Sequence, residues 1–250
     1  MTDWLAIERA GLCAWPALVT ERYDGWILRY ARGYTRRANS INPLCTSTLP
    51  LATKADYCVH RYRAEGLAPV WRIVDRGPAL AVDAWLDREG WVQRDETLVL
   101  WRTPNVADAE PSSLAGLEAS ELGPWVQAYA RITGDGCDQR THKDILHRVR
   151  HCSVRLTVVR DRRPVACTLA VMGNGLLSIL DVAVEPAWRR RGLATALLLQ
   201  ALRWGAAQGA RGAILSVLGT NVPARALYAK LGFASVYAYW YREWPAGDAA

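Results

Sequence analysis

The stretch Ile179-Leu-Asp-Val-Ala-Val-Glu-Pro-Ala-Trp-Arg-Arg-Arg-Gly-Leu-Ala-Thr-Ala-Leu-Leu198 decides the fold, because an apolar, β-rich run meets a glycine-bearing turn and then an apolar helix. Pro186 cannot donate a backbone hydrogen bond and favours an extended Glu185, so we expect the strand to end there. A helix is predicted to begin near Gly192. Its first turn leaves N–H groups unpaired at the positive end of the helix dipole, which suits a phosphate. Positive charge is added by Arg189, Arg190 and Arg191.

This phosphate-binding pattern is not one of the two commonest. Neither Gly-x-Gly-x-x-Gly nor Gly-x-x-x-x-Gly-Lys-Ser/Thr occurs in the stretch, so a dinucleotide or nucleoside-triphosphate loop is not expected. The residues instead resemble motif A of the GNAT family (GCN5-related N-acetyltransferases), Gln/Arg-x-x-Gly-x-Gly/Ala. The match is carried by Arg189, Gly192 and Ala194. The family's next strand and its motif B helix are matched in order and spacing by Leu215–Val217, Asn221 and Ala226–Phe233.

The resemblance covers Leu114–Trp244 and, more loosely, the N-terminal half. It implies an α/β protein with the GNAT fold, a mixed, mostly antiparallel sheet flanked by helices. Residues 51–101 repeat the order helix, strand, helix, Gly-Trp, strand, so we expect a degenerate GNAT-like pseudo-repeat as the N-terminal half. That half has no Arg-x-x-Gly-x-Gly/Ala segment and is not expected to bind cofactor in the usual way. The expected domains are 1–103, degenerate and GNAT-like; 104–113, a linker; and 114–250, catalytic.

The resemblance also implies acetyl-CoA, or another acyl-CoA, as cosubstrate and no metal. The pyrophosphate would bind N–H groups from Arg191 to Thr195, and the pantetheine arm would pair with the backbone of Asp181–Val184, where strands splay apart in the family. Asn221 would contact the cofactor, although it is equally a candidate helix N-cap. The cofactor-binding residues implied are Val182, Ala183, Val184, Arg189, Arg190, Arg191, Gly192, Leu193, Ala194, Thr195, Asn221 and Tyr228.

Two catalytic residues are candidates, Tyr228 and Asp181. Tyr228 lies where the family commonly has its general acid, and the alternative is a tyrosine that packs beside other apolar residues of the helix. A phenol with a pKa of ~10 is a weak acid toward a thiolate whose thiol has a pKa of ~8.5, so it would act with the transition state. The general base stays open between Asp181 on the central strand, Glu185 at its end and a water chain.

We interpret the sequence as an acyl-CoA-dependent N-acyltransferase that moves an acetyl group to a primary amine by direct transfer in a ternary complex. The alternative is a non-catalytic acyl-CoA-binding sensor or interaction module. The acceptor stays open between a small-molecule amine, which we favour because the added domain could enclose a pocket, and a protein N-terminus or lysine. The loop Gly33–Leu44 either lines that pocket or forms a local turn network. Its polar residues are Arg36, Arg37, Asn39 and Ser40.

Charge and hydropathy exclude several other classes. The formal net charge is +7, but arginines are dispersed among acidic residues, so we expect a solvated basic surface and no specific nucleic-acid binding. That charge would suit an anionic cofactor. The chain has no basic start followed by an apolar run and no long uncharged apolar stretch. We expect a cytoplasmic protein that does not bind membranes, and the oligomeric state stays open.

Cysteine and histidine spacing indicates neither a disulfide framework nor a zinc site. The 6 cysteines are scattered and form no Cys-x-x-Cys pair. His142, His147, His151 and Cys152 lie close in sequence, but His142 and His147 do not share a helix face as a metal-binding pair would. We expect these residues to be solvated side chains on a short helix.

Overall fold

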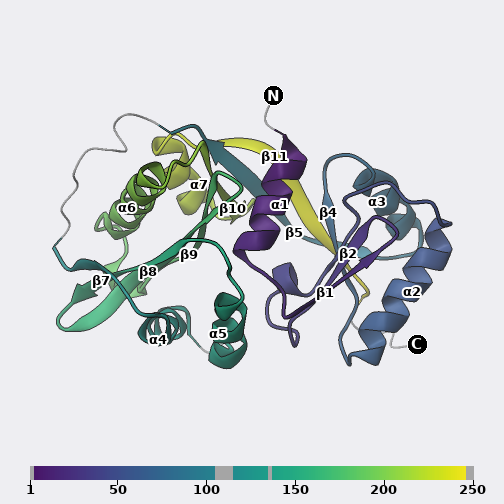
Figure 1. Cartoon of the computed structure of the whole chain (residues 1–250), viewed down its shortest axis with the longest axis horizontal. Helices are drawn as coiled ribbons and strands as arrows, with labels where there is room; N and C mark the ends of the chain where they lie inside the picture. The colour runs from purple at the N-terminus through teal and green to yellow at the C-terminus, as the bar shows by residue number, and fades with distance from the viewer. Residues whose placement is uncertain (1–2, 105–114, 135–136, 246–250) are drawn as a thin grey trace. The chain divides into compact units, whose positions relative to one another are not determined.

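The computed structural model describes residues 3–104, 115–134 and 137–245 (Figure 1). These residues form an α/β fold whose elements are α1 (Trp4–Ala14), β1 (Val19–Tyr23), β2 (Trp26–Tyr30), η1 (Arg36–Ala38), β3 (Ile41–Asn42), α2 (Leu51–Ala64), β4 (Val70–Val74), α3 (Ala79–Arg88), β5 (Val92–Arg102), β6 (Leu117–Ala119), α4 (Leu122–Thr133), α5 (Gln139–His147), β7 (Ser153–Arg160), β8 (Arg163–Gly173), β9 (Leu176–Val184), η3 (Pro186–Trp188), α6 (Leu193–Ala207), β10 (Gly212–Leu218), α7 (Val222–Lys230) and β11 (Ala234–Glu243).

Hydrogen bonds join the described strands in an 11-stranded sheet with the order β1-β2-β3-β4-β11-β5-β10-β9-β8-β7-β6. The sheet is mixed and mostly antiparallel, with parallel pairing of β3 with β4 and of β9 with β10. The predicted fold class is confirmed. Within the described ranges, no helix combines the length and apolar character needed to cross a membrane.

The described residues form two compact units, and each unit combines segments from both ends of the chain. Unit 1 consists of Met1–Pro16, Leu100–Ser216 and Pro223–Ala234, and unit 2 of Ala17–Val99, Val217–Val222 and Ser235–Ala250. Helix α1 therefore belongs with the C-terminal half, and nearly all of β11 belongs with the N-terminal half. The domain boundaries expected from the sequence assign neither α1 nor β11 to the opposite half of the chain, and they stay a prediction. The expected linker 104–113 lies outside the described residues except for Pro104.

In unit 1, helices pack against the strands of the sheet. Helices α4 and α6 both pack on β7, β8 and β9, and Figure 1 shows α6 above these strands and α4 below them. Helix α1 packs on β8 and β9. A Cβ added to Gly205 of α6 would lie 2.6 Å from the Leu177 side chain, so this helix approaches β9 closely. The residues of α6 that are buried, at helical spacing, are Leu193, Leu197, Leu198, Ala201 and Leu202.

Residues Glu118–Ile132 have the composition of a helix, but helix α4 begins only at Leu122. Leu117–Ala119 instead form β6, whose partner is β7, with Leu117 opposite Val158. Pairing satisfies the backbone groups at the edge of β7, and this long-range gain outweighs the local helical pattern.

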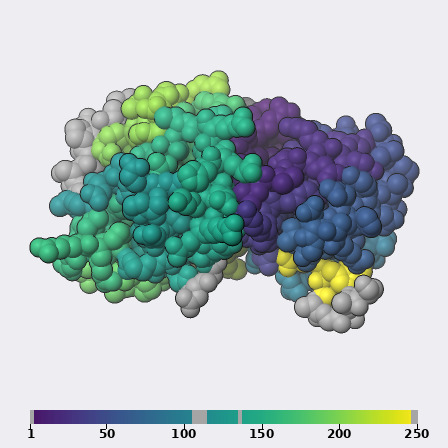
Figure 2. All heavy atoms as spheres, turned by 60° about the horizontal axis from the view of Figure 1, so that its bottom comes forward, coloured from purple at the N-terminus to yellow at the C-terminus, as the bar shows by residue number. Residues whose placement is uncertain are grey.

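The C-terminal strand is part of unit 2. In Figure 2 the yellow atoms near the C-terminus lie against blue atoms from the first hundred residues. Strand β11 pairs with β4 in antiparallel fashion, with Tyr239 opposite Val74 and Glu243 opposite Val70. Arg242 then links β11 to α3: its Nε lies 2.8 Å from Asp83 Oδ1, and its Nη1 lies 2.7 Å from Asp87 Oδ1. The guanidinium is buried, so these charge-assisted bonds tie the last strand firmly to the unit.

Removing the charge of Arg242 tests this tie. Arg242→Met should lower the free energy of unfolding by about 3 kcal/mol, because Asp83 would lose its buried counter-charge. Asp87→Ala is the matched control: its side chain is 68% exposed, and the loss should stay under about 1 kcal/mol. Urea unfolding curves measure both. Equal losses for the two variants would contradict the assigned role of Arg242.

The exchange of terminal segments predicts that the fragment of residues 114–250 does not fold alone. It lacks α1 of unit 1, and its β11 has no β4 to pair with. An unpaired β11 presents open backbone groups and aromatic side chains, which favour aggregation. Size-exclusion chromatography and near-ultraviolet circular dichroism of the fragment and of the intact chain test this. A monomeric, folded and active fragment would show that the exchanged segments are dispensable.

Candidate active site

The candidate site lies in unit 1, where β9 separates from β10. Their parallel register runs from Leu176 opposite Gly212 to Ser178 opposite Ile214 and does not continue along the rest of these described strands. On its other edge β9 remains paired with β8 as far as Val184 opposite Ala166. One edge of β9 is therefore left without β10 over its second half, as the splay expected from the GNAT resemblance requires.

A β-bulge at Asp181 marks this separation. The β8–β9 register shifts between Cys167 and Leu169, whose partners are Ala183 and Leu180. Asp181 has a φ of 51°, in the left-handed region that aspartate tolerates better than most residues. Thr168 Oγ1 donates to the Leu180 carbonyl oxygen at 2.9 Å and holds the partner strand against the bulge. A bulge of this kind re-aims a side chain, here the carboxylate of Asp181.

The end of β9 leads through η3 into the N-terminus of α6, as the sequence predicted. Gly192 is the N-cap residue with a φ of 76°, and no side chain caps the helix. A Cβ at Gly192 would meet no atom within 4 Å, so there is open space beside the Cα of this residue. The first-turn N–H groups and the positive end of the helix dipole lie at this helix end, which is a geometry suited to an anion. The candidate cofactor residues Leu193, Ala194 and Thr195 form this first turn.

Three exposed arginines precede this helix end. Arg189 Nε donates to the Val184 carbonyl oxygen at 3.2 Å, which ties the loop to the end of β9. The guanidinium of Arg191 lies 4.9 Å from the centre of the Trp188 ring. Arg190 has a φ of 62°, a left-handed conformation at the tightest part of the turn. The charges of Arg189, Arg190 and Arg191 thus gather at the positive end of α6.

Asp181 lies beside His142, which the sequence interpretation had placed among solvated residues. That interpretation was wrong for His142, whose side chain is 0% exposed, while the Asp181 side chain is 12% exposed. His142 Nε2 lies 3.2 Å from Asp181 Oδ2, and Cys137 Sγ lies 3.6 Å from His142 Nδ1. The physical reason is helical periodicity: the buried residues of α5 are Thr141, His142, Ile145 and Leu146. That apolar spacing could have revealed the buried histidine from the sequence.

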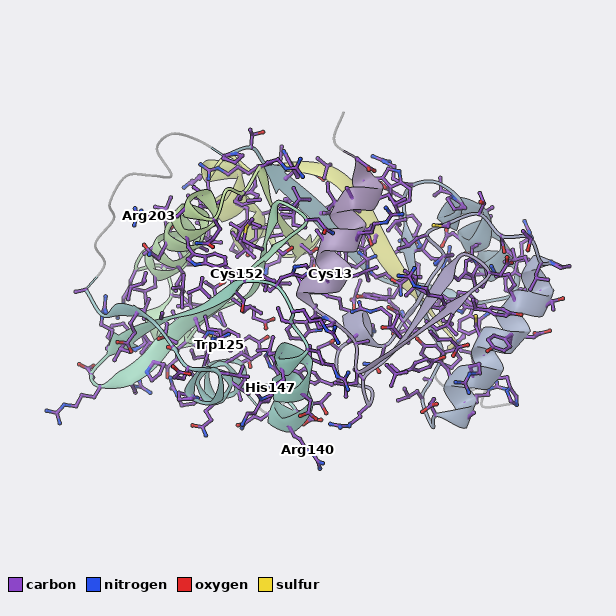
Figure 3. All side chains as sticks on the ribbon, in the orientation of Figure 1. Cys13, Trp125, Arg140, His147, Cys152 and Arg203 are labelled. Carbon is purple, nitrogen blue, oxygen red and sulfur yellow. The ribbon has the colours of Figure 1, made fainter. Side chains whose placement is uncertain are left out.

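Aromatic rings surround the His142 imidazole. The ring centres of Trp15, Trp125 and Tyr129 lie 5.1, 5.7 and 4.9 Å from it, each in an edge-to-face arrangement. Trp125 of α4 and the exposed His147 of α5 are labelled in Figure 3. Trp125 Nε1 donates to the Leu156 carbonyl oxygen at 3.2 Å, which fixes this ring against β7. The imidazole is therefore held rigidly in an apolar enclosure.

Glu185, the competing base candidate, is engaged elsewhere. Its Oε1 lies 3.0 Å from Arg163 Nη1 and 3.4 Å from Arg131 Nη1. Two arginines therefore engage one oxygen of the Glu185 carboxylate. Asp181 raises the pKa of the neighbouring Cys167 thiol, although burial of that thiol is the larger cause. Of the two carboxylates, Asp181 lies beside an imidazole and Glu185 lies beside two guanidinium groups.

Tyr228 lies on α7 of unit 1 and is 7% exposed. Its ring contacts Phe233 edge to face at 6.2 Å between centres. Burial raises the pKa of Tyr228 to about 12, so the phenol stays protonated at neutral pH. Asn221 precedes α7 and is assigned to unit 2, apart from the unit that holds Gly192 and Tyr228. The roles of both residues stay predictions.

The polar loop Gly33–Leu44 of unit 2 forms the local turn network that the sequence suggested as one alternative. Asn39 Oδ1 accepts from the N–H groups of Ala31 at 2.7 Å and Gly33 at 3.0 Å. Asn39 Nδ2 donates to the carbonyl oxygens of Tyr34 and Thr35. Asn39 therefore shapes the loop.

Among the residues that the structure describes, no group of His, Cys, Asp and Glu side chains forms a metal site.

A protein-family model described as "Probable histone acetyltransferase Rv0428c C-terminal" matches residues 2–242. The chain belongs to this GNAT acetyltransferase family. Uncharacterized N-acetyltransferase YobR of Bacillus subtilis (strain 168) is 24% identical over 260 residues, which cover 97% of this chain and 99% of that protein. The GNAT resemblance read from the sequence is confirmed, and the chain is a GNAT-type N-acetyltransferase homologue.

Solved GNAT structures share the fold of the whole chain. A GCN5-related N-acetyltransferase from Kribbella flavida has a TM-score of 0.70 at 18% identity and covers 99% of this chain and 97% of its own. A tandem GNAT protein from the clavulanic acid biosynthesis pathway has a TM-score of 0.62 at 15% identity and covers 95% of this chain and 87% of its own. The tandem arrangement is thus shared, and GNAT membership implies an acyl-CoA cosubstrate.

The open space at Gly192 gives a direct test of acetyl-CoA binding. At ~100 times its dissociation constant, acetyl-CoA should raise the free energy of unfolding by about 2.7 kcal/mol. Gly192→Val should remove this effect, because the new side chain would occupy the open space beside its Cα at the N-terminus of α6.

Gly209 provides the matched control at the other end of α6. It has a φ of 77°, and a Cβ there also meets no atom within 4 Å, so Gly209→Val carries similar backbone strain. This variant should keep the full stabilisation by acetyl-CoA. Thermal-shift titration measures both variants, and equal responses would contradict the placement of the cofactor at Gly192.

Proposed function

We propose that the protein transfers an acetyl group from acetyl-CoA directly to a primary amine in a ternary complex. One observation supports this most: β9 leaves β10 after Ser178 and runs, past the bulge at Asp181, into the uncapped N-terminus of α6. A strand edge can pair with the amide groups of a pantetheine arm. A helix N-terminus flanked by arginines can bind a pyrophosphate.

In this proposal the backbone of Val182, Ala183 and Val184 holds the pantetheine arm. The N–H groups from Arg191 to Thr195 hold the pyrophosphate. All three valine and alanine side chains are half-buried, so these residues act through their backbone conformation. The residues present therefore fit an acyl-CoA: an open helix end, a strand edge and nearby cations.

The chemistry needs a base for the amine and a hydrogen-bond donor for the departing thiolate. Asp181 accepts the amine proton, directly or through one water, because its carboxylate is partly exposed and Glu185 is neutralised by two arginines. Tyr228 supplies the donor. Since burial raises its pKa to about 12, the phenol shares its hydrogen with the thiolate as charge develops and does not give it up in advance.

The net charge of the protein is the basis for choosing between the two classes of acceptor. A net charge of +7 disfavours the approach of a strongly basic peptide, so we propose a small amine. The family's description names a histone acetyltransferase, which makes a lysine-containing basic peptide the competing acceptor. Thiol release from acetyl-CoA, measured across small amines, amino sugars and lysine peptides, decides between them. Acetyl-CoA binding without turnover on any amine would favour a sensor.

Tyr228→Phe separates a catalytic tyrosine from a structural one. Loss of the hydroxyl should lower turnover by ~100-fold or more while the affinity for acetyl-CoA changes little. Tyr62→Phe is the control, because the buried Tyr62 hydroxyl donates to the Arg29 carbonyl oxygen at 2.7 Å. That variant should lose about 1 kcal/mol of stability and keep its turnover per folded molecule.

Turnover, acetyl-CoA affinity and melting temperature are measured on one preparation of each variant. Should Tyr228→Phe lose stability and retain turnover, the hydroxyl has a packing role and the proposed donor is wrong.

A further inference from the structure

We propose that His142 is a positioning residue that orients the Asp181 carboxylate for proton transfer, with Cys137 fixing the imidazole tautomer. This inference rests on the proposed function of Asp181 as the base. Its starting point is the alignment of three side chains, in which Cys137 Sγ lies 3.6 Å from His142 Nδ1 and His142 Nε2 lies 3.2 Å from Asp181 Oδ2. The imidazole therefore presents one nitrogen to a thiol and the other to a carboxylate.

The two partners assign the tautomer of His142. In this inference Cys137 donates to an Nδ1 that carries no hydrogen, because the carboxylate beside the other ring nitrogen can only accept when it is ionised. Nε2 then carries the imidazole hydrogen, on the side of the ring that lies 3.2 Å from Asp181 Oδ2. A carboxylate facing an N–H is held in one orientation, which is how a second residue positions a catalytic group.

The surroundings of the His142 side chain support a functional role in addition to packing. Its side chain is fully buried among Trp15, Trp125 and Tyr129, and burial of an imidazole in an apolar enclosure is unfavourable unless its nitrogens are used. Helix α5 is oriented at its start by Asp138, whose Oδ1 accepts from the Thr141 N–H at 3.0 Å. His142 follows Thr141 directly, so the capped first turn sets the direction of the imidazole.

The contact between His142 and Asp181 is close but not aligned as a hydrogen bond in this state. Asp181 Oδ2 is buried, and no hydrogen bond reaches it in the described structure despite the 3.2 Å separation. A buried carboxylate oxygen in this condition calls for an explanation. His142 Nε2, at 3.2 Å, is close enough to donate to this oxygen once the two groups align.

The position of Asp181 on the bulge gives the carboxylate two neighbours of different kinds. His142 approaches from α5, and Cys167 lies beside it on β8, where Asp181 raises the pKa of that thiol. Cys167 is fully buried and opposite Ala183 in the β8–β9 ladder. Of these two neighbours, only His142 has an N–H to offer Asp181.

A matched pair of variants isolates the donor at Nε2. His142→Gln and His142→Met remove the ring alike and have similar length, but only glutamine keeps a donor. We expect kcat of the Met variant to fall by about 100-fold and that of the Gln variant by about tenfold, with KM for acetyl-CoA changed less than about twofold. His147→Met, on the exposed face of the same helix, should behave as the unaltered protein.

A double-mutant cycle tests whether His142 acts through Asp181. Asp181→Asn tolerates the left-handed φ of 51°, removes the charge and replaces one carboxylate oxygen by an NH2 group of similar size. Because His142 acts only through that carboxylate, Asp181→Asn combined with His142→Met should be no slower than Asp181→Asn alone. Additive losses would overturn the inference.

Two further measurements test the positioning role of His142 even if the His142 and Asp181 variants fold poorly. The ¹⁵N chemical shifts of His142 in the unaltered protein should show Nδ1 without hydrogen and Nε2 with it, and the opposite tautomer would overturn the proposal. Cys137→Ala should lower kcat by less than about tenfold, since the thiol only sets the tautomer. A loss as large as that of Asp181→Asn, with an acetylated Cys137 found by mass spectrometry, would make the thiol a nucleophile and overturn the positioning role.

The outcome for the unaltered protein separates the two proposals. No thiol release on any amine overturns the proposed function, and this inference with it. Turnover that is normal in the unaltered protein and unchanged in His142→Met overturns the inference alone.

Discussion

The left-handed backbone of Asp181 is the constraint on which the candidate site depends. A φ of 51° in the middle of a strand cannot continue a regular ladder, so the β8–β9 register shifts at this residue. The pairing of β9 with β10 has already ended at Ser178, and β9 runs on with one open edge. The open edge of β9, the redirected carboxylate of Asp181 and the passage of the chain toward the N-terminus of α6 therefore all lie close to this one left-handed residue.

The two carboxylates at β9, Asp181 within the strand and Glu185 just after it, have different charged neighbours and therefore different chemistry. Glu185 forms ion pairs with Arg131 of α4 and Arg163 of β8. Asp181 faces an imidazole in an aromatic enclosure, where the dielectric is low and electrostatic contacts are strong. The same side-chain chemistry therefore gives a structural ion pair at one position and a candidate base at the other.

The exchange of terminal segments makes the two units depend on the whole chain. Residue Trp15, at the end of α1, contacts the His142 ring of unit 1, whereas β11 completes the sheet strands of unit 2 with β4. Arg242 adds charge-assisted bonds to α3 within unit 2. Order in the candidate site thus requires the first residues of the chain as well as those of the motif.

The sequence by itself determined the local features of this protein. Pro186, Gly192 and the motif spacing predicted where β9 ends, where α6 begins and that the chain resembles GNAT proteins, because turn chemistry and helix starts depend on neighbouring residues. The order helix, strand, helix, strand predicted for residues 51–101 is likewise the order of α2, β4, α3 and β5, since such patterns are local.

Only the tertiary structure decided which side chains meet. The pairing of His142 with Asp181, the neutralisation of Glu185, the edge strand β6 and the exchange of α1 and β11 all join residues far apart in the chain. No local pattern encodes such contacts, because their free energy comes from burial and from charges that approach only once the sheet has formed. The choice between two nearby carboxylates was for this reason open in the sequence, and their different neighbours in the fold are what the proposal for Asp181 rests on.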